Sequence, residues 1–239
     1  MIALATIIDT HSEASGFPIG MEITFSTYIL FTASLVAWCT VHSLLISPGV
    51  SRYMERRLGP LFRYYRISYN IFSLLSLIFP LLFGLYLQSY EIVLFSWSQG
   101  WVVIRYGLLF CASALFYLGA RHYDLRHFLG TAQIRSGAKS MLLSDGSDFV
   151  TSGISGVTRH PWYLGGIIFI WSAADNVYPS TLITACFVSA YFVIGSFLEE
   201  RKLHKKFGQP YEDYQKEVSM LCPVKWLQGQ LKRRTTRGN

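Results

Sequence analysis

The chain has 239 residues, 51% of them hydrophobic and 16% aromatic, and its formal net charge is +7. A soluble domain carries about 25% charged residues, whereas this chain carries 15%. Its apolar runs are also too long for ordinary core helices, so the expected environment is a lipid bilayer. The basic residues lie in loops between apolar runs instead of forming a stripe on a soluble domain, which argues against a nucleic-acid partner.

The N-terminal region does not resemble a cleavable signal peptide. Residues 1–21 contain Asp9 and Glu13 but no Lys or Arg, so the basic region that opens such a peptide is missing. We expect residues 1–22 to form an extracytoplasmic N-terminus that stays attached to the first apolar segment.

Three long apolar segments follow one another in the first half of the chain. They run from about Ile23 to Ile46, from Ile67 to Leu87 and from Trp101 to Ala120. Each has about 20 residues, enough to cross ~30 Å of hydrocarbon as a helix. The region 23–120 is therefore predicted to hold three transmembrane helices.

Two further apolar segments are predicted to form a helical hairpin. The fourth, Trp162–Ala174, covers only ~20 Å as a helix and cannot span the bilayer alone. The fifth begins near Pro179, stays apolar to Leu198 and continues as a charged helix over Glu199–Phe207. Because only residues 175–179 link the two segments, they are expected to lie side by side.

The distribution of Lys and Arg predicts the orientation. Every Lys and Arg except Arg105 falls in the first loop, in the third loop or after the fifth segment. The positive-inside rule makes that side cytoplasmic, with the N-terminus outside and the C-terminus inside. Arg105 lies near one end of the third segment, where its long side chain can snorkel.

The sequence thus predicts an all-α, polytopic membrane protein with five transmembrane segments in a single domain, 1–239. After the first three helices we expect a cytoplasmic loop over 121–160, the hairpin and following segment over 161–223, and a basic tail over 224–239.

No metal site is expected. Cys39, Cys111 and Cys186 fall inside apolar segments, and Cys222 belongs to no CxxC or Cys/His ligand spacing.

Polar residues suited to a binding site form two clusters at the predicted cytoplasmic face. The first is the stretch GISGVTRHPWYLGG, residues 153–166, in which Pro161 begins a helix whose positive end favours an anion. Gly165 lets another backbone or a flat ring approach closely. The second is the pair Glu199 and Glu200. Taken alone, the first cluster is better explained as a tightly packed helix start and the second as a solvated helix face. The hairpin, however, returns both clusters to the same face.

The order of these motifs resembles the superfamily of isoprenylcysteine carboxyl methyltransferases and phospholipid methyltransferases. The chain has RHPWYLGG, a long apolar stretch, EERKLHKKFGQPYEDYQKEV and a closing LCP, within residues 153–223. Upstream, VHSLL (41–45), RISYNIFSLLSL (66–77) and YDLRHFLGTAQ (123–133) resemble a bacterial subgroup. That subgroup contains methanethiol S-methyltransferase and membrane proteins associated with nitric oxide reduction, which implies the bacterial inner membrane as the location.

The resemblance implies S-adenosylmethionine as the cofactor, bound within 161–223. Glu199 or Glu200 would hold its charged end, and the two tyrosines of the tail would close the pocket. The implied cofactor-binding residues are His160, Pro161, Tyr163, Leu164, Gly165, Glu199, Tyr211 and Tyr214. Arg159 and Glu200 are the catalytic candidates, which would orient the methyl acceptor.

The resemblance leaves several acceptors open. A small or lipophilic acceptor is implied, with a thiol favoured, a prenylcysteine carboxylate next and a lipid amine as a further option; membrane lipid is the other expected partner. An NADPH-dependent reductase of the sterol-reductase type shares an R-H-P-x-Y-like element, but five segments argue against it. A non-catalytic membrane accessory protein is the third interpretation.

Three polar features have two interpretations each. His42 is either a helix-end residue hydrogen-bonded to a neighbouring carbonyl, which we expect, or part of the acceptor cavity. Asn70 is either a tie between helices or part of the acceptor path. The loop 121–158 is either a connection or a cover for the site, since loops longer than ~12 residues are often functional.

Overall fold

A computed structural model describes residues 23–121, 125–136 and 151–237 of the chain. The expectation of an extracytoplasmic N-terminus, 1–22, lies outside the described residues. So do parts of the predicted cytoplasmic loop, namely 122–124 and 137–150.

The described chain is almost entirely helical and contains four helices long and apolar enough to cross a membrane. These are α2 (Phe25–Ile46), α4 (Tyr65–Gln88), α5 (Trp101–Ala120) and α9 (Pro179–Phe207). They match the first, second, third and fifth predicted segments. The fourth segment becomes α8 (Pro161–Ser172), which has 12 residues and is shorter than a spanning helix. The all-α class is therefore confirmed, while five transmembrane segments are not.

Short elements connect the long helices. They are α3 (Pro48–Leu58), η1 (Gly59–Tyr64), β1 (Phe95–Ser96), α6 (Leu125–Leu129), α7 (Thr131–Ser136), η2 (Gly153–Gly156), β2 (Asn176–Val177), α10 (Gln209–Glu217) and α11 (Val224–Arg237). β1 and β2 form one antiparallel pair, in which Phe95 faces Val177 and Ser96 faces Asn176. Most of the predicted basic tail is helical, as α11.

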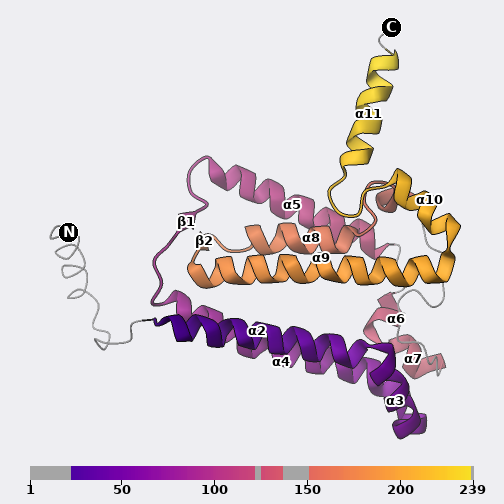
Figure 1. Cartoon of the computed structure of the whole chain (residues 1–239). Coiled ribbons are helices and arrows are strands. Elements are labelled where there is room, and N and C mark those ends of the chain that lie inside the picture. The colour runs from indigo at the N-terminus through magenta and orange to yellow at the C-terminus, as the bar shows by residue number, and fades with distance from the viewer. Residues whose placement is uncertain (1–22, 122–124, 137–150, 238–239) are drawn as a thin grey trace.

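The long helices form two groups that run in similar directions (Figure 1). α2 and α4 make one pair, and α5, α8 and α9 make the other group. The β1–β2 pair lies at one end of the bundle, while α3, α6, α7, α10 and α11 gather at the opposite end. α8 and α9 lie side by side as the predicted helical hairpin.

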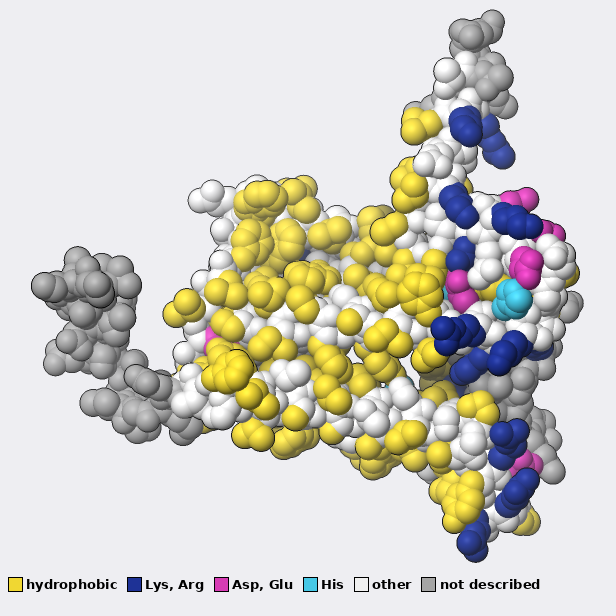
Figure 2. Space-filling model, in the orientation of Figure 1, with side chains coloured by type: hydrophobic (Ala, Val, Ile, Leu, Met, Phe, Trp, Pro, Cys, Tyr) yellow, Lys and Arg dark blue, Asp and Glu magenta, His cyan; other side chains and the backbone are white. Residues whose placement is uncertain are grey.

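The outer surface of the bundle is apolar. Phe25, Val103 and Phe110, for example, are 80%, 75% and 74% exposed. Contact between water and so large an apolar surface would be unfavourable. Figure 2 shows hydrophobic side chains covering the middle of the molecule and Lys and Arg side chains gathered at the end that carries α3, α10 and α11. This pattern is that of an integral membrane protein with a strongly basic end.

At the opposite end of the bundle, two charged side chains bind backbone groups at the helix termini. Arg105 donates from Nε to the carbonyl of Ser172 and from Nη2 to that of Ala173, each at 2.9 Å, and pairs with Asp175. Arg105, on α5, thus caps the C-terminal end of α8, where a cation is favoured. Glu91 accepts hydrogen bonds from the backbone N–H of Ser180, at 3.0 Å, and from its hydroxyl, at 2.6 Å, at the start of α9.

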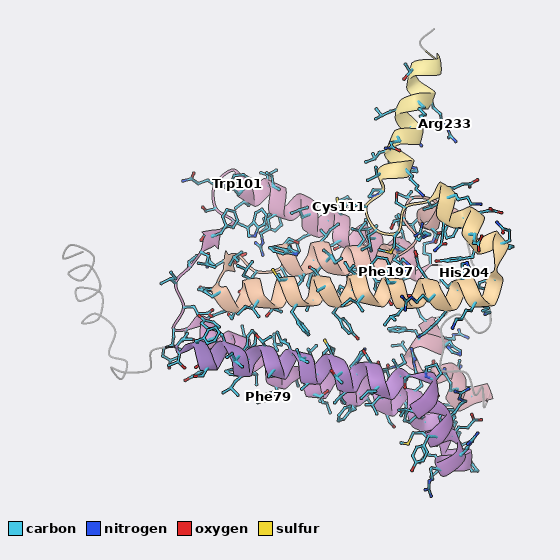
Figure 3. All side chains as sticks on the ribbon, viewed as in Figure 1. Phe79, Trp101, Cys111, Phe197, His204 and Arg233 are labelled. Atoms are coloured by element: carbon cyan, nitrogen blue, oxygen red, sulfur yellow. The ribbon has the colours of Figure 1, made fainter. Side chains whose placement is uncertain are left out.

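Glycines let α8 pack closely against its neighbours. A Cβ on Gly165 would lie 3.2 Å from Cβ of Leu115 on α5, and one on Gly166 would lie 2.5 Å from the ring of Phe192 on α9. The short helix is therefore held closely on two sides, against α5 at Gly165 and against the Phe192 ring of α9 at Gly166. Small residues commonly allow such close packing between helices in membranes. Figure 3 shows the side chains that fill the space between these helices.

We expect Gly166→Ala to destabilise the protein because the added methyl group would overlap the Phe192 ring. Overpacking of this kind costs about 1–3 kcal/mol and would lower the thermal unfolding midpoint in detergent. Gly107→Ala on α5 is the matched control, since a Cβ there meets nothing within 4 Å. Equal midpoints for the two variants would contradict this account of α8.

Candidate functional site

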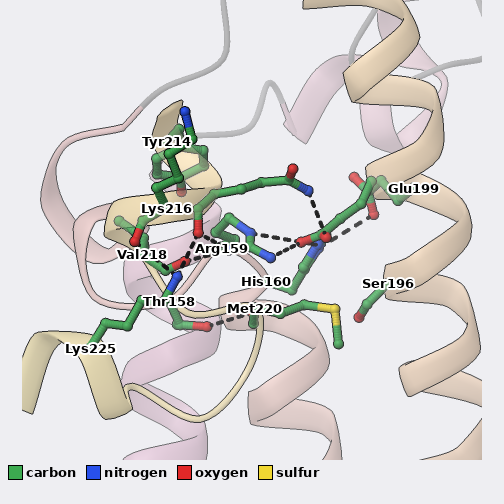
Figure 4. Close-up of polar contacts among 12 residues, drawn as sticks. Thr158, Arg159, His160, Ser196, Glu199, Tyr214, Lys216, Val218, Met220 and Lys225 are labelled. Carbon is green, nitrogen blue, oxygen red and sulfur yellow. Dashed lines mark hydrogen bonds and ion pairs between the residues drawn. The ribbon is translucent and has the colours of Figure 1, made fainter. Parts of the chain in front are cut away.

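The polar site forms where the start of α8, the basic-end turns of α9 and the segment after α10 meet (Figure 4). Thr158 pairs with Ser219 in an isolated parallel bridge. The N–H of Arg159 donates to the carbonyl of Ser219 at 3.0 Å, and that of His160 donates to Met220 at 3.1 Å. These backbone bonds hold the residues before α8 against the segment after α10, and Pro161 then begins the helix.

A buried ion pair joins Arg159 to Glu200. Nε and Nη2 of Arg159 lie 2.7 and 2.6 Å from Oε1 of Glu200, and the two side chains are 8% and 11% exposed. Nη1 donates to the carbonyls of Gln215, at 3.2 Å, and Val218. All three nitrogens of the guanidinium group therefore bind within the protein, and they tie α8, α9 and α10 together.

The two adjacent glutamates differ in what they contact. Oε1 of Glu200 also lies 3.3 Å from Nε2 of His160, and its Oε2 accepts from Gln215 Nε2 at 3.0 Å. Both oxygens of Glu200 are thus engaged. Glu199, by contrast, is 36% exposed and approaches Nδ1 of His160 only at 3.8 Å. Glu199 is the carboxylate of the pair that remains accessible to a cationic ligand.

Three aromatic rings form a stack beside these glutamates. The His160 and Tyr163 rings lie 5.5 Å apart at 12°, and the Tyr163 and Phe192 rings lie 5.5 Å apart at 18°. The stack connects the residue before α8 to the middle of α9. It places flat apolar surface next to an acidic pair, which suits a ligand that has both a ring and a cationic group.

Tyr211 and Tyr214 pack α10 against the rest of the site. Their rings meet edge to face at 5.9 Å in a buried cluster with Val218, and the hydroxyl of Tyr214 donates to the carbonyl of Ser155 at 2.6 Å. Burial raises the pKa of Tyr211, with the charge of Glu200 adding to the effect. Burial also raises the pKa of Tyr214 to about 12, partly offset by Arg159.

The structure brings most of the predicted site residues together. Arg159, His160, Tyr163, Glu199 and Glu200 meet directly or through one shared contact. The remaining predicted residues are in packing positions. Pro161 is buried at the first position of α8, Leu164 is half-buried one turn later, and α5 occupies the space beside Gly165.

Sequence reasoning missed the residues that act through the backbone. The carbonyls of Gln215 and Val218 accept from Arg159, and those of Gln215 and Lys216 accept from Lys225 Nζ at 2.7 and 2.9 Å. A backbone carbonyl leaves no mark in the sequence. The side chain of Gln215, directly after the second tyrosine of the FGQPYEDY motif, is the one signal that could have been recognised.

Asn70 and His42, two polar residues of the long helices, both link elements of the fold. Asn70 Nδ2 donates to the carbonyls of Phe128 and Leu129, each at 3.1 Å, so it ties α4 to α6. His42 lies between α2 and α4, with Nδ1 3.1 Å from Ser73 Oγ and Nε2 2.9 Å from the hydroxyl of Tyr69. The partners of His42 are side chains and not the backbone carbonyl that we expected.

Residues 30–225 match the family model described as NnrU protein. The chain belongs to the NnrU protein family. It is 33% identical over 120 residues to "Methanethiol S-methyltransferase" of Pseudomonas deceptionensis, covering 50% of this chain and 42% of that protein. It is 43% identical over 65 residues to "Methanethiol S-methyltransferase 1" of Bradyrhizobium diazoefficiens, covering 27% of this chain and 22% of that protein.

The NnrU-family chain is also 37% identical over 65 residues to "Methanethiol S-methyltransferase" of Mycobacterium tuberculosis, covering 27% of this chain and 26% of that protein. It thus aligns with less than half the length of each of these relatives. No solved structure matches the chain. The family and the relatives' names support a membrane protein of methyltransferase type, as the motif resemblance implies.

We expect Glu200→Gln to destabilise the protein strongly, because it leaves the buried guanidinium group of Arg159 without its counter-charge. Breaking a buried pair in this way costs about 3–5 kcal/mol. Glu199→Gln should change the thermal midpoint little, since the Glu199 side chain is 36% exposed and makes one long contact. Differential scanning fluorimetry in detergent measures both.

Asp213→Asn is the surface control for the glutamate pair, since Asp213 is 59% exposed and pairs with Lys216. Lys216 holds the pKa of Asp213 below its usual range, but an exposed pair contributes only ~0–1 kcal/mol. A loss of stability in Asp213→Asn as large as that in Glu200→Gln would contradict the special position of Glu200.

We expect Tyr214 to make folding stability pH-dependent in alkali. An unfolded tyrosine ionises near pH 10, whereas the pKa of Tyr214 is about 12 in the folded protein. The neutral hydroxyl thus contributes full stability below pH 10, and that contribution is lost as the pH rises toward 12. Tyr214→Phe should lower the free energy of unfolding by about 1 kcal/mol at neutral pH, because a hydrogen bond is missing. Between pH 10 and 12, however, the stability of this variant should fall less than that of wild type. Parallel declines in denaturant-unfolding midpoint would refute this.

Proposed function

We propose that this protein is an integral-membrane methyltransferase that uses S-adenosylmethionine and acts on a small or lipophilic acceptor. A thiol is the favoured acceptor and a prenylcysteine carboxylate the next. The observation that carries the proposal is the accessible carboxylate of Glu199 beside the stacked rings of His160 and Tyr163. The names of the relatives support both the reaction and the thiol.

The residues present fit the cofactor's chemistry. Its amino group and sulfonium are cationic and suit Glu199, whereas Glu200 is already engaged with Arg159, His160 and Gln215. Its adenine needs a flat apolar surface, which the ring stack provides. Its carboxylate is favoured at the positive end of α8. Each part of the cofactor therefore has a suitable group within this one region.

When bound, S-adenosylmethionine supplies a methyl carbon on a positively charged sulfur, open to in-line displacement. The protein's contribution would be alignment of the methyl donor with the acceptor. Glu199 holds positive charge close to the rings, and His160 and Tyr163 form one wall. The buried Arg159–Glu200 pair fixes the positions of His160 and Gln215. We therefore assign Arg159 and Glu200 a positioning role, since the contacts of both are satisfied within the protein.

We also propose that α8 is part of a fifth crossing. β1 and β2 pair at the end of the bundle opposite the basic residues, so the chain must travel between the two ends through α8. Its 12 residues cover ~18 Å, and the six residues 173–178 can add up to ~20 Å. With the basic end in the cytoplasm, the N-terminus lies outside and the C-terminus inside.

Calorimetry on the purified full chain tests the cofactor. We expect S-adenosylmethionine to bind and NADPH not to bind, and Glu199→Gln to weaken binding about 10-fold through loss of one charge-assisted contact without lowering the thermal midpoint. Binding of NADPH alone would favour a reductase. A methyl-transfer screen over methanethiol, a prenylcysteine and a phospholipid amine then identifies the acceptor, and no transfer to any of them would favour an accessory role.

A further inference from the structure

A hollow lies away from the Arg159–Glu200 site, at the corner between α2, α3, η1 and α4. It has a volume of about 550 Å³, within the ~300–1,000 Å³ range of ligand pockets. Its lining is mostly apolar and consists of Leu45, Met54, Leu58, Leu61, Tyr64, Tyr65, Ser68, Tyr69 and Phe72. We call it the corner groove.

The corner groove has a rigid floor and a rim that faces outward. Tyr65 and Tyr69 are buried, and their hydroxyls bond within the protein, to the carbonyl of Leu45 at 2.9 Å and to Nε2 of His42 at 2.9 Å. The rings are thus held in place and present apolar surface. Leu61 and Phe72, at the rim, are 61% and 48% exposed. The groove is therefore open to the surroundings of the bundle.

One cationic group lies at the rim of this apolar groove, and a second lies nearby on α3. The guanidinium group of Arg63 lies over the ring of Tyr64, a groove residue, at 4.8 Å, and that of Arg57 lies over the ring of Tyr53 at 5.5 Å. Arg57 also directly precedes the groove residue Leu58. Both arginines are exposed. In the part of the chain that the structure describes, neither forms an ion pair with a carboxylate.

The same segment carries two more arginines on a different face. At 100° per residue, Met54 and Leu58 share the groove side of α3, whereas Arg52 and Arg56 lie on the far side. Glu55 is the acidic residue of α3. Figure 2 shows basic side chains beside hydrophobic ones over this corner. α3 therefore has the pattern of a basic amphipathic helix at a membrane interface.

We propose that the corner groove binds one anionic phospholipid from the surrounding bilayer. An acyl chain fills the apolar groove, and the phosphate headgroup pairs with Arg57 and Arg63 at the rim. The combination matches such a lipid because the apolar lining suits the acyl chain and the arginines at the rim suit the phosphate. This inference does not depend on methyl transfer.

Native mass spectrometry of the full chain, released from nanodiscs of equal phosphatidylglycerol and phosphatidylcholine, tests the proposal. We expect wild type to retain one phosphatidylglycerol in preference to phosphatidylcholine. Arg57→Gln with Arg63→Gln should weaken retention about 30-fold, since each surface charge contributes ~1 kcal/mol to anionic-lipid binding. Ser68→Trp, which fills the groove from an exposed position, should abolish retention while the thermal midpoint stays unchanged.

Arg52→Gln with Arg56→Gln is the matched control, because it removes the same charge from the face of α3 that points away from the groove. It should retain most of the lipid. An equal loss in both double variants would mean diffuse attraction of the basic end and would overturn the site. Equal retention of the two lipids would remove the headgroup assignment, and a lipid-free dimer that Ser68→Trp dissociates would make a second copy the occupant.

Discussion

The Arg159–Glu200 ion pair is the interaction on which the basic end of this protein depends. It joins the residue two before α8 to the end of α9 and, through the carbonyls of Gln215 and Val218, to the segment after α10. Two charges with 8% and 11% exposure are costly to bury and stay charged only because every polar atom has a partner. The pair thereby fixes where His160 and Glu199 can lie.

The bilayer imposes the second constraint. α8 is too short to span the bilayer alone. The unpaired backbone groups at its ends therefore need side-chain partners, and its faces need close packing against neighbouring helices. Arg105 binds the carbonyls at its C-terminal end, while Gly165 and Gly166 bring its backbone against α5 and α9. A short helix held this firmly brings its N-terminal residues, Pro161 and Tyr163, to the depth at which α9 changes from apolar to charged.

The proposed cofactor site and the corner groove lie on two different sets of helices. The first lies on α8, α9 and α10, where acidic and aromatic groups adjoin a buried ion pair. The second lies on α2, α3, η1 and α4, where apolar surface adjoins arginines that form no ion pair with a carboxylate among the described residues. α6 connects the two regions along the chain and is tied to α4 through Asn70. Both features occur at the basic end, where side chains can meet water and headgroups.

The sequence by itself determined the helical class, the position of the long helices and the residues that would gather at the basic end. These follow from hydrophobic length and from charge distribution, which are local properties of the chain. Pro161 and Pro179 marked the starts of α8 and α9 for the same reason, since proline fits the first turn of a helix.

Only the tertiary structure decided which glutamate is engaged and which is accessible. Glu199 and Glu200 are adjacent and chemically identical, but helical geometry separates them by ~100°. Glu200 therefore meets Arg159 and Gln215, while Glu199 stays partly exposed beside His160. The roles of the Gln215 and Val218 carbonyls, the α5 contact of Gly165 and the corner groove were equally hidden. Each depends on segments distant in the chain, and contacts made by backbone or by shape leave no residue pattern to recognise.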